Sequence, residues 1–122
     1  MPTDAARVLV IDDEAVLRGL LCEMLSACGY DVDVAEDGAA GLARYQAQRY
    51  RAVITDLLMP GMNGFEVVAA LRTIDPEARI IMLTGSAPEP TARRARESGV
   101  TLLLKPIALG ALKAAVDAAC RV

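Results

Sequence analysis

Carboxylates placed to do chemistry follow two short apolar runs of this sequence. Asp12 and Asp13 come directly after the run VLVI, and Asp56 comes directly after the run AVIT. Two carboxylates about 4 Å apart repel each other by about 4 kcal/mol at an effective dielectric constant of about 20, so a cluster of them favours a bound cation. Because the ligands are oxygens and water can complete the shell, the expected cation is Mg²⁺ or Mn²⁺.

A hydroxyl and an ammonium follow two further apolar runs. Thr84 ends the run IIMLT, and Lys105 directly follows TLLL. Phosphoryl transfer requires in-line positioning and neutralised phosphoryl oxygens, which a metal ion, a lysine and a threonine hydroxyl supply. A carboxylate beside them can act as the nucleophile and form an aspartyl phosphate. Asp56 stands alone, whereas Asp12 and Asp13 are adjacent as metal ligands are, so Asp56 is the predicted acceptor.

Five strands alternating with helices are expected to bring these residues together. The apolar runs that predict strands are Val8–Ile11, Val32–Ala35, Ala52–Thr55, Ile80–Leu83 and Thr101–Leu104. The second run follows a polar–apolar alternation, which is typical of an edge strand. We predict an α/β fold with a doubly wound five-stranded parallel sheet, strand order 2-1-3-4-5 and five helices. Ligands of such sheets bind beyond the carboxyl ends of the strands, where the candidate residues converge.

Helical periodicity separates the predicted strands. The first helix should bury one wide apolar face, formed by Val16, Leu17, Leu20, Leu21, Met24 and Leu25. A weaker face near the C-terminus contains Leu109, Leu112 and Val116. Gly29 and Gly99 each lie between a helical segment and a strand, where a left-handed residue ends a helix.

Composition and charge exclude several functions. The 122 residues carry 13 Lys and Arg against 16 Asp and Glu, which argues against nucleic-acid binding through bulk charge. The absence of His removes the most common general base and most zinc sites. No apolar run approaches the roughly 20 residues that cross a bilayer, and the N-terminal residues lack a secretory pattern. We therefore expect one cytoplasmic domain at residues 1–122, without membrane insertion or direct nucleic-acid contact.

The cysteines give no sign of a redox or metal site. Cys22, Cys28 and Cys120 are odd in number, and no CxxC pair occurs. We expect reduced thiols packed in the core.

Four stretches of the chain resemble the receiver domain of bacterial two-component response regulators, the CheY-like family. They are VLVIDDE at 8–14, ITDLLMPGMNG at 54–64, MLTGSA at 82–87 and LLLKP at 102–106. The resemblance covers essentially the whole chain. It implies a phosphorylation-activated switch that accepts a phosphoryl group on Asp56 from a histidine kinase or a histidine phosphotransfer protein. Such a domain is a phosphoacceptor that catalyses its own phosphorylation and dephosphorylation rather than a conventional enzyme.

The same resemblance implies the metal ligands. Mg²⁺ would be held by Asp13, Asp56 and the backbone carbonyl of Leu58, while Asp12 would act partly through water. Mn²⁺ is the other cation that this ligand set accepts.

The resemblance also implies the groups that contact the phosphoryl oxygens. Thr84 would be the switch hydroxyl that turns toward the phosphoryl group, and Lys105 would contact its oxygens. The bond between Lys105 and Pro106 would be cis. Signalling to a downstream protein would use the surface of the fourth helix, the fifth strand and the fifth helix. We expect no output domain on this chain, which is either a stand-alone receiver or a piece of a hybrid kinase or longer regulator.

The sequence departs from the receiver pattern near this output surface. Receivers usually carry Tyr or Phe three residues before the lysine, and Leu102 occupies that position here. The sequence leaves open whether the switch movement of Thr84 is coupled to Leu102. Leu58 and Ser86 flank the site and are expected to influence the lifetime of the acyl phosphate, because an apolar Leu58 hinders the attacking water.

Other interpretations of these residues remain. A pseudo-receiver would bind partners without phosphorylation, and the change at Leu102 keeps this alternative open. The acidic stretch Asp12–Glu14 is also typical of a helix N-terminus. The arginines at 93, 94 and 96 indicate a solvated helix face or a docking patch for an acidic partner. A phosphatase of the haloacid-dehalogenase type would need D-x-D after the first strand, and a flavodoxin-type module would need a Ser/Thr-rich loop there; neither is present.

Overall fold

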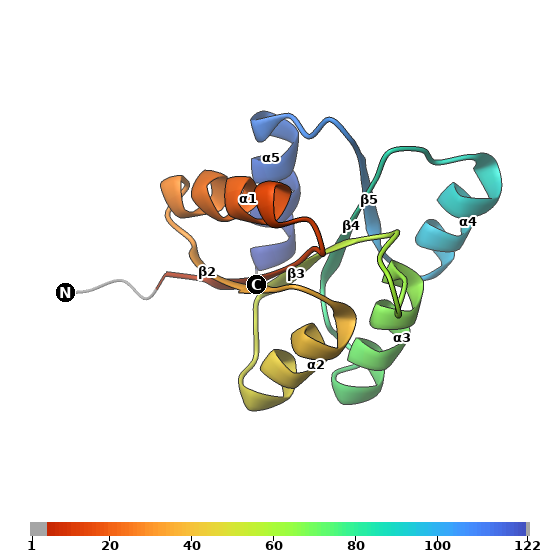
Figure 1. Ribbon diagram of the computed structural model, residues 1–122, viewed down its shortest axis with the longest axis horizontal. Coiled ribbons are helices and arrows are strands. Elements are labelled where there is room, and N and C mark those ends of the chain that lie inside the picture. The colour runs from red at the N-terminus through yellow and green to blue at the C-terminus, as the bar shows by residue number, and fades with distance from the viewer. Residues whose placement is uncertain (1–4, 122) are drawn as a thin grey trace.

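The computed structural model describes residues 5–121, which form one sheet with helices on both faces (Figure 1). Its strands are β1 (Arg7–Ile11), β2 (Asp31–Ala35), β3 (Ala52–Asp56), β4 (Ile80–Thr84) and β5 (Thr101–Leu104). Its helices are α1 (Ala15–Ala27), α2 (Gly38–Ala47), α3 (Gly64–Ile74), α4 (Glu89–Glu97) and α5 (Leu109–Cys120). The expected domain span of 1–122 includes residues 1–4 and 122, which lie outside the described residues. Within 5–121, no helix combines the length and apolarity needed to span a membrane.

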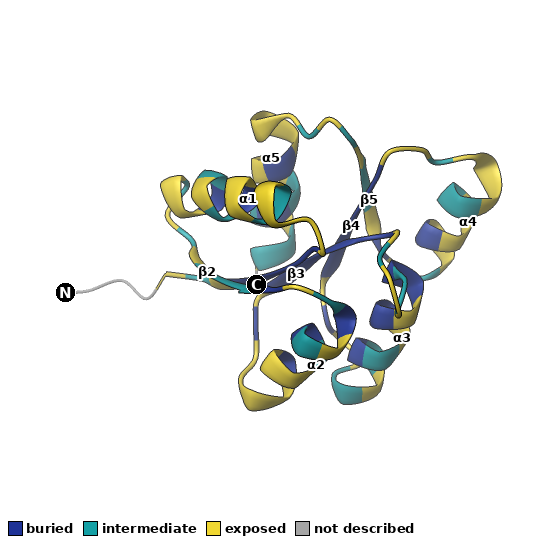
Figure 2. Ribbon diagram, viewed as in Figure 1, coloured by how far each residue is buried: buried dark blue, intermediate teal, exposed yellow. Residues whose placement is uncertain are grey.

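The sheet has the predicted order β2-β1-β3-β4-β5, and all its strands are parallel. Figure 1 shows α1 and α5 on one face and α2 and α3 on the other, with α4 beside β5. Strands β3 and β4 are buried along their whole length, whereas β2 is partly exposed, as expected for an edge strand (Figure 2). The continuous apolar runs therefore lie where both sheet faces are covered.

Two apolar clusters form the core, one on each face of the sheet. On the face of α1 and α5, Leu21 and Leu25 pack with Leu112 and Val116, as predicted. The predicted width of the α1 face was wrong, because Val16 is 82% exposed and Leu20 is exposed as well; on α5 the predicted Leu109 is also exposed. The reason is geometric: a helix lying on a flat sheet buries a narrow stripe of positions three or four apart, and the flanking positions stay in solvent.

The ends of α1 and α4 follow the sequence prediction. Gly29 and Gly99 have φ angles of 94° and 66°, the left-handed conformation in which glycine ends a helix without steric cost.

Cys22, Cys28 and Cys120 are free thiols but only half-buried. The expectation that they pack in the core holds for Cys120, which packs against the apolar cluster of α1 and α5, and was wrong for Cys22 and Cys28, which belong to neither apolar cluster.

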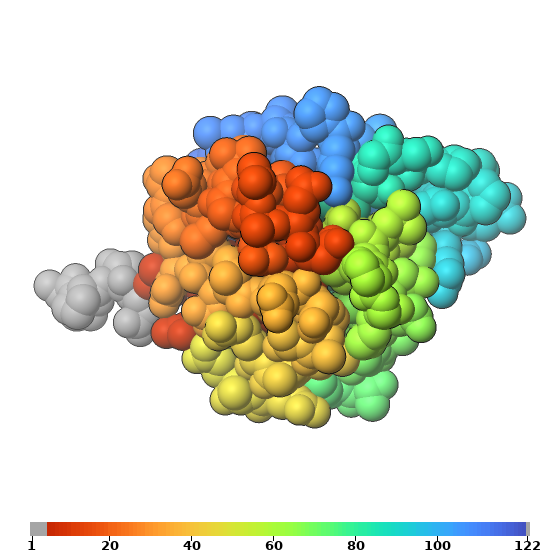
Figure 3. Space-filling model, viewed as in Figure 1, coloured from red at the N-terminus to blue at the C-terminus, as the bar shows by residue number. Residues whose placement is uncertain are grey.

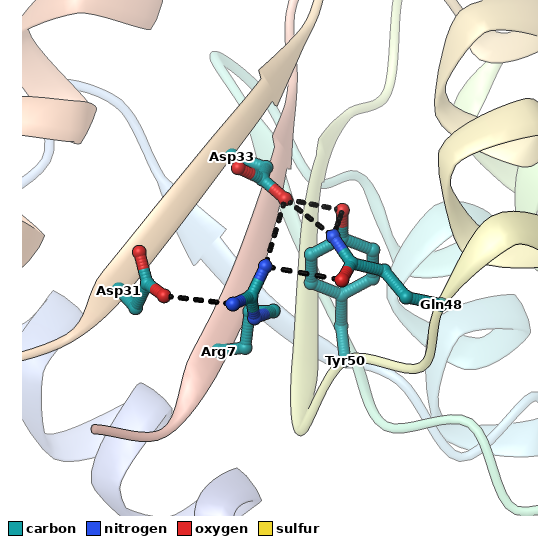
Figure 4. A network of polar contacts seen from close by, with 5 residues as sticks. All are labelled: Arg7, Asp31, Asp33, Gln48 and Tyr50. Carbon is teal, nitrogen blue, oxygen red and sulfur yellow. Dashed lines mark hydrogen bonds and ion pairs between the residues drawn. The ribbon is translucent and has the colours of Figure 1, made fainter. Parts of the chain in front are cut away.

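A polar network ties the edge strand β2 to the sheet at the end opposite the candidate site (Figure 4). Arg7 on β1 forms ion pairs with Asp31 at 3.2 Å and with Asp33 at 3.8 Å. Tyr50, just before β3, donates a hydrogen bond to Asp33 at 2.5 Å, and the Gln48 amide donates to the same carboxylate at 2.9 Å. These contacts hold β2 against β1 although few apolar side chains cover this edge.

Candidate functional site

The backbone ladder of the sheet continues into the candidate site and fixes its side chains. The amide of Asp12 donates to the carbonyl of Ala35 at 3.1 Å, one residue beyond the end of β1. The amide of Lys105 donates to the carbonyl of Thr84 at 2.8 Å, one residue beyond the end of β5. The residues that follow the strands are therefore as rigidly held as the strands, which suits a binding site.

Three of the predicted residues form an acidic cluster at the carboxyl ends of β1 and β3. One carboxylate oxygen from each of Asp12, Asp13 and Asp56 lies within 4.8 Å of the others. Asp12 is 0% exposed and Asp56 is 6% exposed, whereas Asp13 is exposed to solvent. The cluster thus has two buried carboxylates and one open side, an arrangement that accepts a cation together with water.

The surroundings of Asp12 indicate an unmet need for positive charge. Its Oδ1 accepts a hydrogen bond from the amide of Glu14 at 2.8 Å. Its Oδ2 is buried and has no hydrogen-bond partner among the described residues. Burial raises the pKa of Asp12, and the neighbouring charge of Asp56 raises it further. A buried, unpaired carboxylate oxygen is costly, so this donor set fits a hard cation bound by oxygen ligands.

The helix-cap interpretation of the acidic stretch does not account for this geometry. Glu14 occupies the N-cap position of α1, but its side chain forms no capping hydrogen bond. Arg18 on the first turns of α1 donates to the backbone carbonyl of Asp12 at 2.8 Å, which holds the loop in place. No residue pattern points to Arg18, because its partner is a main-chain oxygen that any residue would offer.

Lys105 supplies the positive charge of the site. Its Nζ lies 2.9 Å from Oδ1 of Asp56. Burial lowers the pKa of Lys105, but the hydrogen bond and charge of Asp56, together with Asp12, outweigh this effect and leave the pKa raised. The ammonium is therefore fully charged at neutral pH. The bond between Lys105 and Pro106 is cis.

Thr84 lies beside the cluster, but its hydroxyl is engaged elsewhere. The side chain is 4% exposed, and its Oγ1 donates to the carbonyl of Ser86 at 2.9 Å. The same oxygen accepts from the amide of Ser86 at 3.3 Å. The hydroxyl is thus bonded to the loop between β4 and α4, which the sequence did not indicate. Any move of the hydroxyl toward Asp56 must break this bond and free the loop.

The loop after β3 approaches the acceptor closely at Gly64. A Cβ added to Gly64 would lie 2.8 Å from the carbonyl oxygen of Asp56 and 2.9 Å from Cα of Leu57. The amide of Gly64 donates to the carbonyl of Leu57 at 2.7 Å. Asn63 then begins α3 with a capping box to Glu66. The requirement for glycine at this position was missed from the sequence, although the MNG turn at 62–64 was its signal.

The two leucines singled out by the sequence lie in different surroundings. Leu58 is 75% exposed and follows the buried Leu57, so its side chain stands in solvent next to the acidic cluster. Leu102 on β5 is half-buried, pairs in register with Met82 and packs against the cluster of residues under α2, α3 and α4. An aliphatic side chain therefore occupies the position between the sheet and α4 where a receiver usually has a ring.

The fold and the site together define a class of protein. A doubly wound sheet carries a buried acidic cluster, a lysine paired to the central carboxylate and a hydroxyl on the adjacent strand, all at its carboxyl edge. A model of the response regulator receiver domain family matches residues 8–117. The chain belongs to this family of two-component signalling domains.

Solved structures agree with this assignment. The chemotaxis protein CheY4 of Vibrio cholerae superposes with a TM-score of 0.89 and 32% identity, over 95% of this chain and 99% of that chain. A receiver domain protein from Clostridium thermocellum gives a TM-score of 0.88 and 30% identity, over 94% of each chain.

Curated relatives are longer than this chain. The sensor protein EvgS of Escherichia coli (strain K12) is 38% identical over 87% of this chain, which spans 9% of that protein. The DNA-binding response regulator MtrA of Mycobacterium tuberculosis is 36% identical over 99% of this chain, which spans 53% of it. The chain thus matches part of a sensor protein and part of a DNA-binding response regulator.

Proposed function

We propose that this chain is a phosphorylation-activated switch in which Asp56 accepts a phosphoryl group from a histidine kinase or a histidine phosphotransfer protein. The observation that carries the proposal is the pairing of the buried Asp56 with Lys105 at 2.9 Å, within 4.8 Å of the carboxylates of Asp12 and Asp13. A buried carboxylate in such a cluster is held at a fixed position, and in-line attack on phosphorus depends on that positioning.

The proposed step transfers one phosphoryl group. A carboxylate oxygen of Asp56 attacks phosphorus, the phosphorus–nitrogen bond of the phosphohistidine breaks, and the imidazole nitrogen takes the electron pair. Lys105 neutralises charge on the phosphoryl oxygens. Thr84 exchanges its bond to the Ser86 carbonyl for one to a phosphoryl oxygen. Reversal to the resting protein follows when water attacks phosphorus and regenerates the Asp56 carboxylate.

Mg²⁺ is the cofactor that the proposal assigns to the acidic cluster. Asp12, Asp13 and Asp56 would hold it, with the backbone carbonyl of Leu58, and the buried unpaired Oδ2 of Asp12 supports this assignment. When bound, the ion supplies the positive charge that three carboxylates and a phosphoryl group require. Mn²⁺ has the same ligand preferences.

The proposal extends to location and output. The switch acts in the cytoplasm, where its kinase donates the phosphoryl group, and it signals through the surface of α4, β5 and α5 to a downstream protein. Relatives in which the matching region is part of a sensor protein or of a DNA-binding response regulator support a role within a relay.

An amide NMR titration tests the proposal. Mg²⁺ is added first, followed by beryllofluoride, a stable mimic of the phosphoryl group, and Asp56→Asn serves as the control. Saturable shifts at Asp13, Asp56, Thr84 and Lys105 that are absent in the control are expected. A lack of any saturable response would overturn the proposal in favour of a pseudo-receiver that binds partners without phosphorylation.

A further inference from the structure

Helix α4 is attached to the rest of the protein by few contacts. Its sequence, EPTARRARE, is polar, and Ala95 is its one buried residue. Figure 3 shows its segment in cyan at the edge of the molecule, next to the green segment of α3. Apolar packing therefore contributes little to the position of α4, and individual polar contacts carry more weight than on the other helices.

The C-terminal end of α4 is held by an arginine from α3. Arg72 donates from Nη1 to the carbonyl of Ser98 at 2.8 Å and from Nε to the carbonyl of Ala78 at 2.9 Å. Arg72 thus links the end of α3, the loop before β4 and the end of α4. The start of α4, at Pro88, follows the loop that is bonded to the Thr84 hydroxyl. The anchored end and the loop end of α4 are therefore controlled by different contacts.

A second arginine connects the body of α4 to α3. Cζ of Arg94 lies 4.2 Å from the ring centroid of Phe65, well inside the roughly 6 Å range of a cation–π contact. Phe65 is the single phenylalanine of the chain and is 8% exposed. The neighbouring Arg96 differs, because it pairs with Glu89 at 2.8 Å within α4 itself.

Phe65 lies one residue from the closest approach to the acceptor. It follows Gly64, whose backbone leaves no room for a Cβ against the carbonyl of Asp56. The backbone of Phe65 therefore continues directly from this close approach, and its ring is covered by Arg94. Position 102 is a leucine and provides no ring between β5 and α4, so Phe65 is the aromatic side chain that α4 contacts, one residue along the chain from Gly64.

We propose that Arg94 is a positioning residue that holds α4 against α3 through Phe65 and thereby opposes activation. The inference rests on the proposed function. Phosphorylation draws the Thr84 hydroxyl away from the Ser86 carbonyl, frees the loop at 85–88 and lets the start of α4 pivot about the end held by Arg72. The Arg94–Phe65 contact favours the position before that pivot. Because conformational coupling is reciprocal, weakening the contact must tighten binding of a phosphoryl mimic.

Fluorine NMR on 4-fluorophenylalanine protein tests this inference, because the single phenylalanine gives a single resonance. Beryllofluoride is titrated in excess Mg²⁺ while the fluorine resonance and the Thr84 amide are followed. Arg94→Gln removes the cation and is expected to bind beryllofluoride about two- to fivefold more tightly, the worth of an exposed cation–π contact. Before beryllofluoride is added, the fluorine resonance of Arg94→Gln should lie closer than that of the wild-type protein to the position of the wild-type protein saturated with beryllofluoride. Arg94→Lys keeps a cation and should restore most of the wild-type behaviour.

Arg93→Gln is the matched control, since Arg93 lies on the same helix and forms no cation–π contact with Phe65 among the described residues. The inference is overturned if Arg94→Gln binds beryllofluoride with wild-type or weaker affinity, or if Arg93→Gln gives the same change. Urea unfolding checks that the variants are folded, and Arg94→Met replaces Arg94→Gln if that variant is not. Failure of the proposed function is seen separately, as a wild-type protein that gives no saturable response and matches Asp56→Asn.

Discussion

The ammonium of Lys105 lies 2.9 Å from Oδ1 of Asp56, although Asp56 ends β3 and Lys105 follows β5, with β4 between these two strands. The pair places the positive charge of Lys105 beside the acidic cluster formed by Asp12, Asp13 and Asp56. A bound metal ion and Lys105 must therefore share the same negative charges, and removal of one changes the affinity for the other.

Replacing Lys105 with methionine is expected to strengthen Mg²⁺ binding and to weaken beryllofluoride binding. A unit charge at about 4 Å is worth about 1–4 kcal/mol between effective dielectric constants of about 80 and 20, so each affinity should change by at least about fivefold. Calorimetric titration measures both. Lys113→Met, which removes the other lysine, is the control and should leave both affinities unchanged. Weaker Mg²⁺ binding in Lys105→Met would contradict the shared-charge account.

The Asp12→Asn variant is expected to be more stable than the wild-type protein in metal-free buffer at pH 7. Burial raises the pKa of Asp12, so its contribution to stability is complete below the unfolded pKa near 3.8 and is lost as pH rises through the folded value. Mg²⁺ at 100 times its Kd should reverse the order, because it stabilises the wild-type protein by about 2.7 kcal/mol. Urea unfolding with EDTA and with Mg²⁺ measures both effects. A wild-type protein that is more stable in EDTA would count against an unpaired Asp12.

Gly64→Ala is expected to destabilise the protein by about 1–3 kcal/mol, the usual cost of overpacking a tight site. The added Cβ would lie 2.8 Å from a backbone oxygen of Asp56, so the acceptor loop must shift. Gly19→Ala is the control, because a Cβ on this α1 residue would meet nothing within 4 Å. It should stabilise the protein by about 0.5–1 kcal/mol through the helix preference for alanine. Thermal unfolding of both variants measures these changes in stability. Equal changes in Gly64→Ala and Gly19→Ala would refute the steric argument.

Tyr45→Phe is expected to destabilise the protein by about 1.5 kcal/mol at neutral pH, because the Tyr45 hydroxyl donates to the carboxylate of Asp75 at 2.7 Å. This hydrogen bond lowers the pKa of Asp75, so the stability it gives is present above about pH 4 and is lost as pH falls through the folded pKa. Burial, with the same bond, raises the pKa of Tyr45 to about 12, so the gain is also lost as pH rises toward that value.

Urea unfolding of wild-type protein and Tyr45→Phe from pH 2 to 11 measures this pH dependence. The difference between the two proteins should be largest between about pH 5 and 9. A difference that stays constant down to pH 2 would show that the hydroxyl acts by packing alone.

Leu58→Asn is expected to shorten the lifetime of the acyl phosphate severalfold. The leucine side chain is 75% exposed beside the acceptor, where it hinders the approach of water, and an amide would instead orient the water. Loss of radiolabelled phosphate from the protein over time gives the rate. Leu109→Asn, which changes another exposed leucine on α5, should keep the wild-type rate. An unchanged lifetime in Leu58→Asn would remove Leu58 from this role.

The order of the sheet and the composition of the site could be predicted from residue patterns along the chain. Continuous apolar runs can be buried only where both faces of a sheet are covered, so β3 and β4 were predicted as central and β2 as an edge. Parallel strands end at one edge, and residues that follow them must converge there. The grouping of Asp12, Asp13 and Asp56 with Lys105 follows from that rule, without knowledge of any side-chain position.

The pairing of individual atoms, by contrast, depends on how the folded elements lie against one another. The exposure of Val16 and Leu20 depends on how α1 lies across the sheet, and the bond from Thr84 to Ser86 depends on the course of one loop. The contact of Arg94 with Phe65 joins two helices whose spacing is set by the strands beneath them. Such contacts depend on distances between segments far apart in the chain, which local residue patterns do not encode.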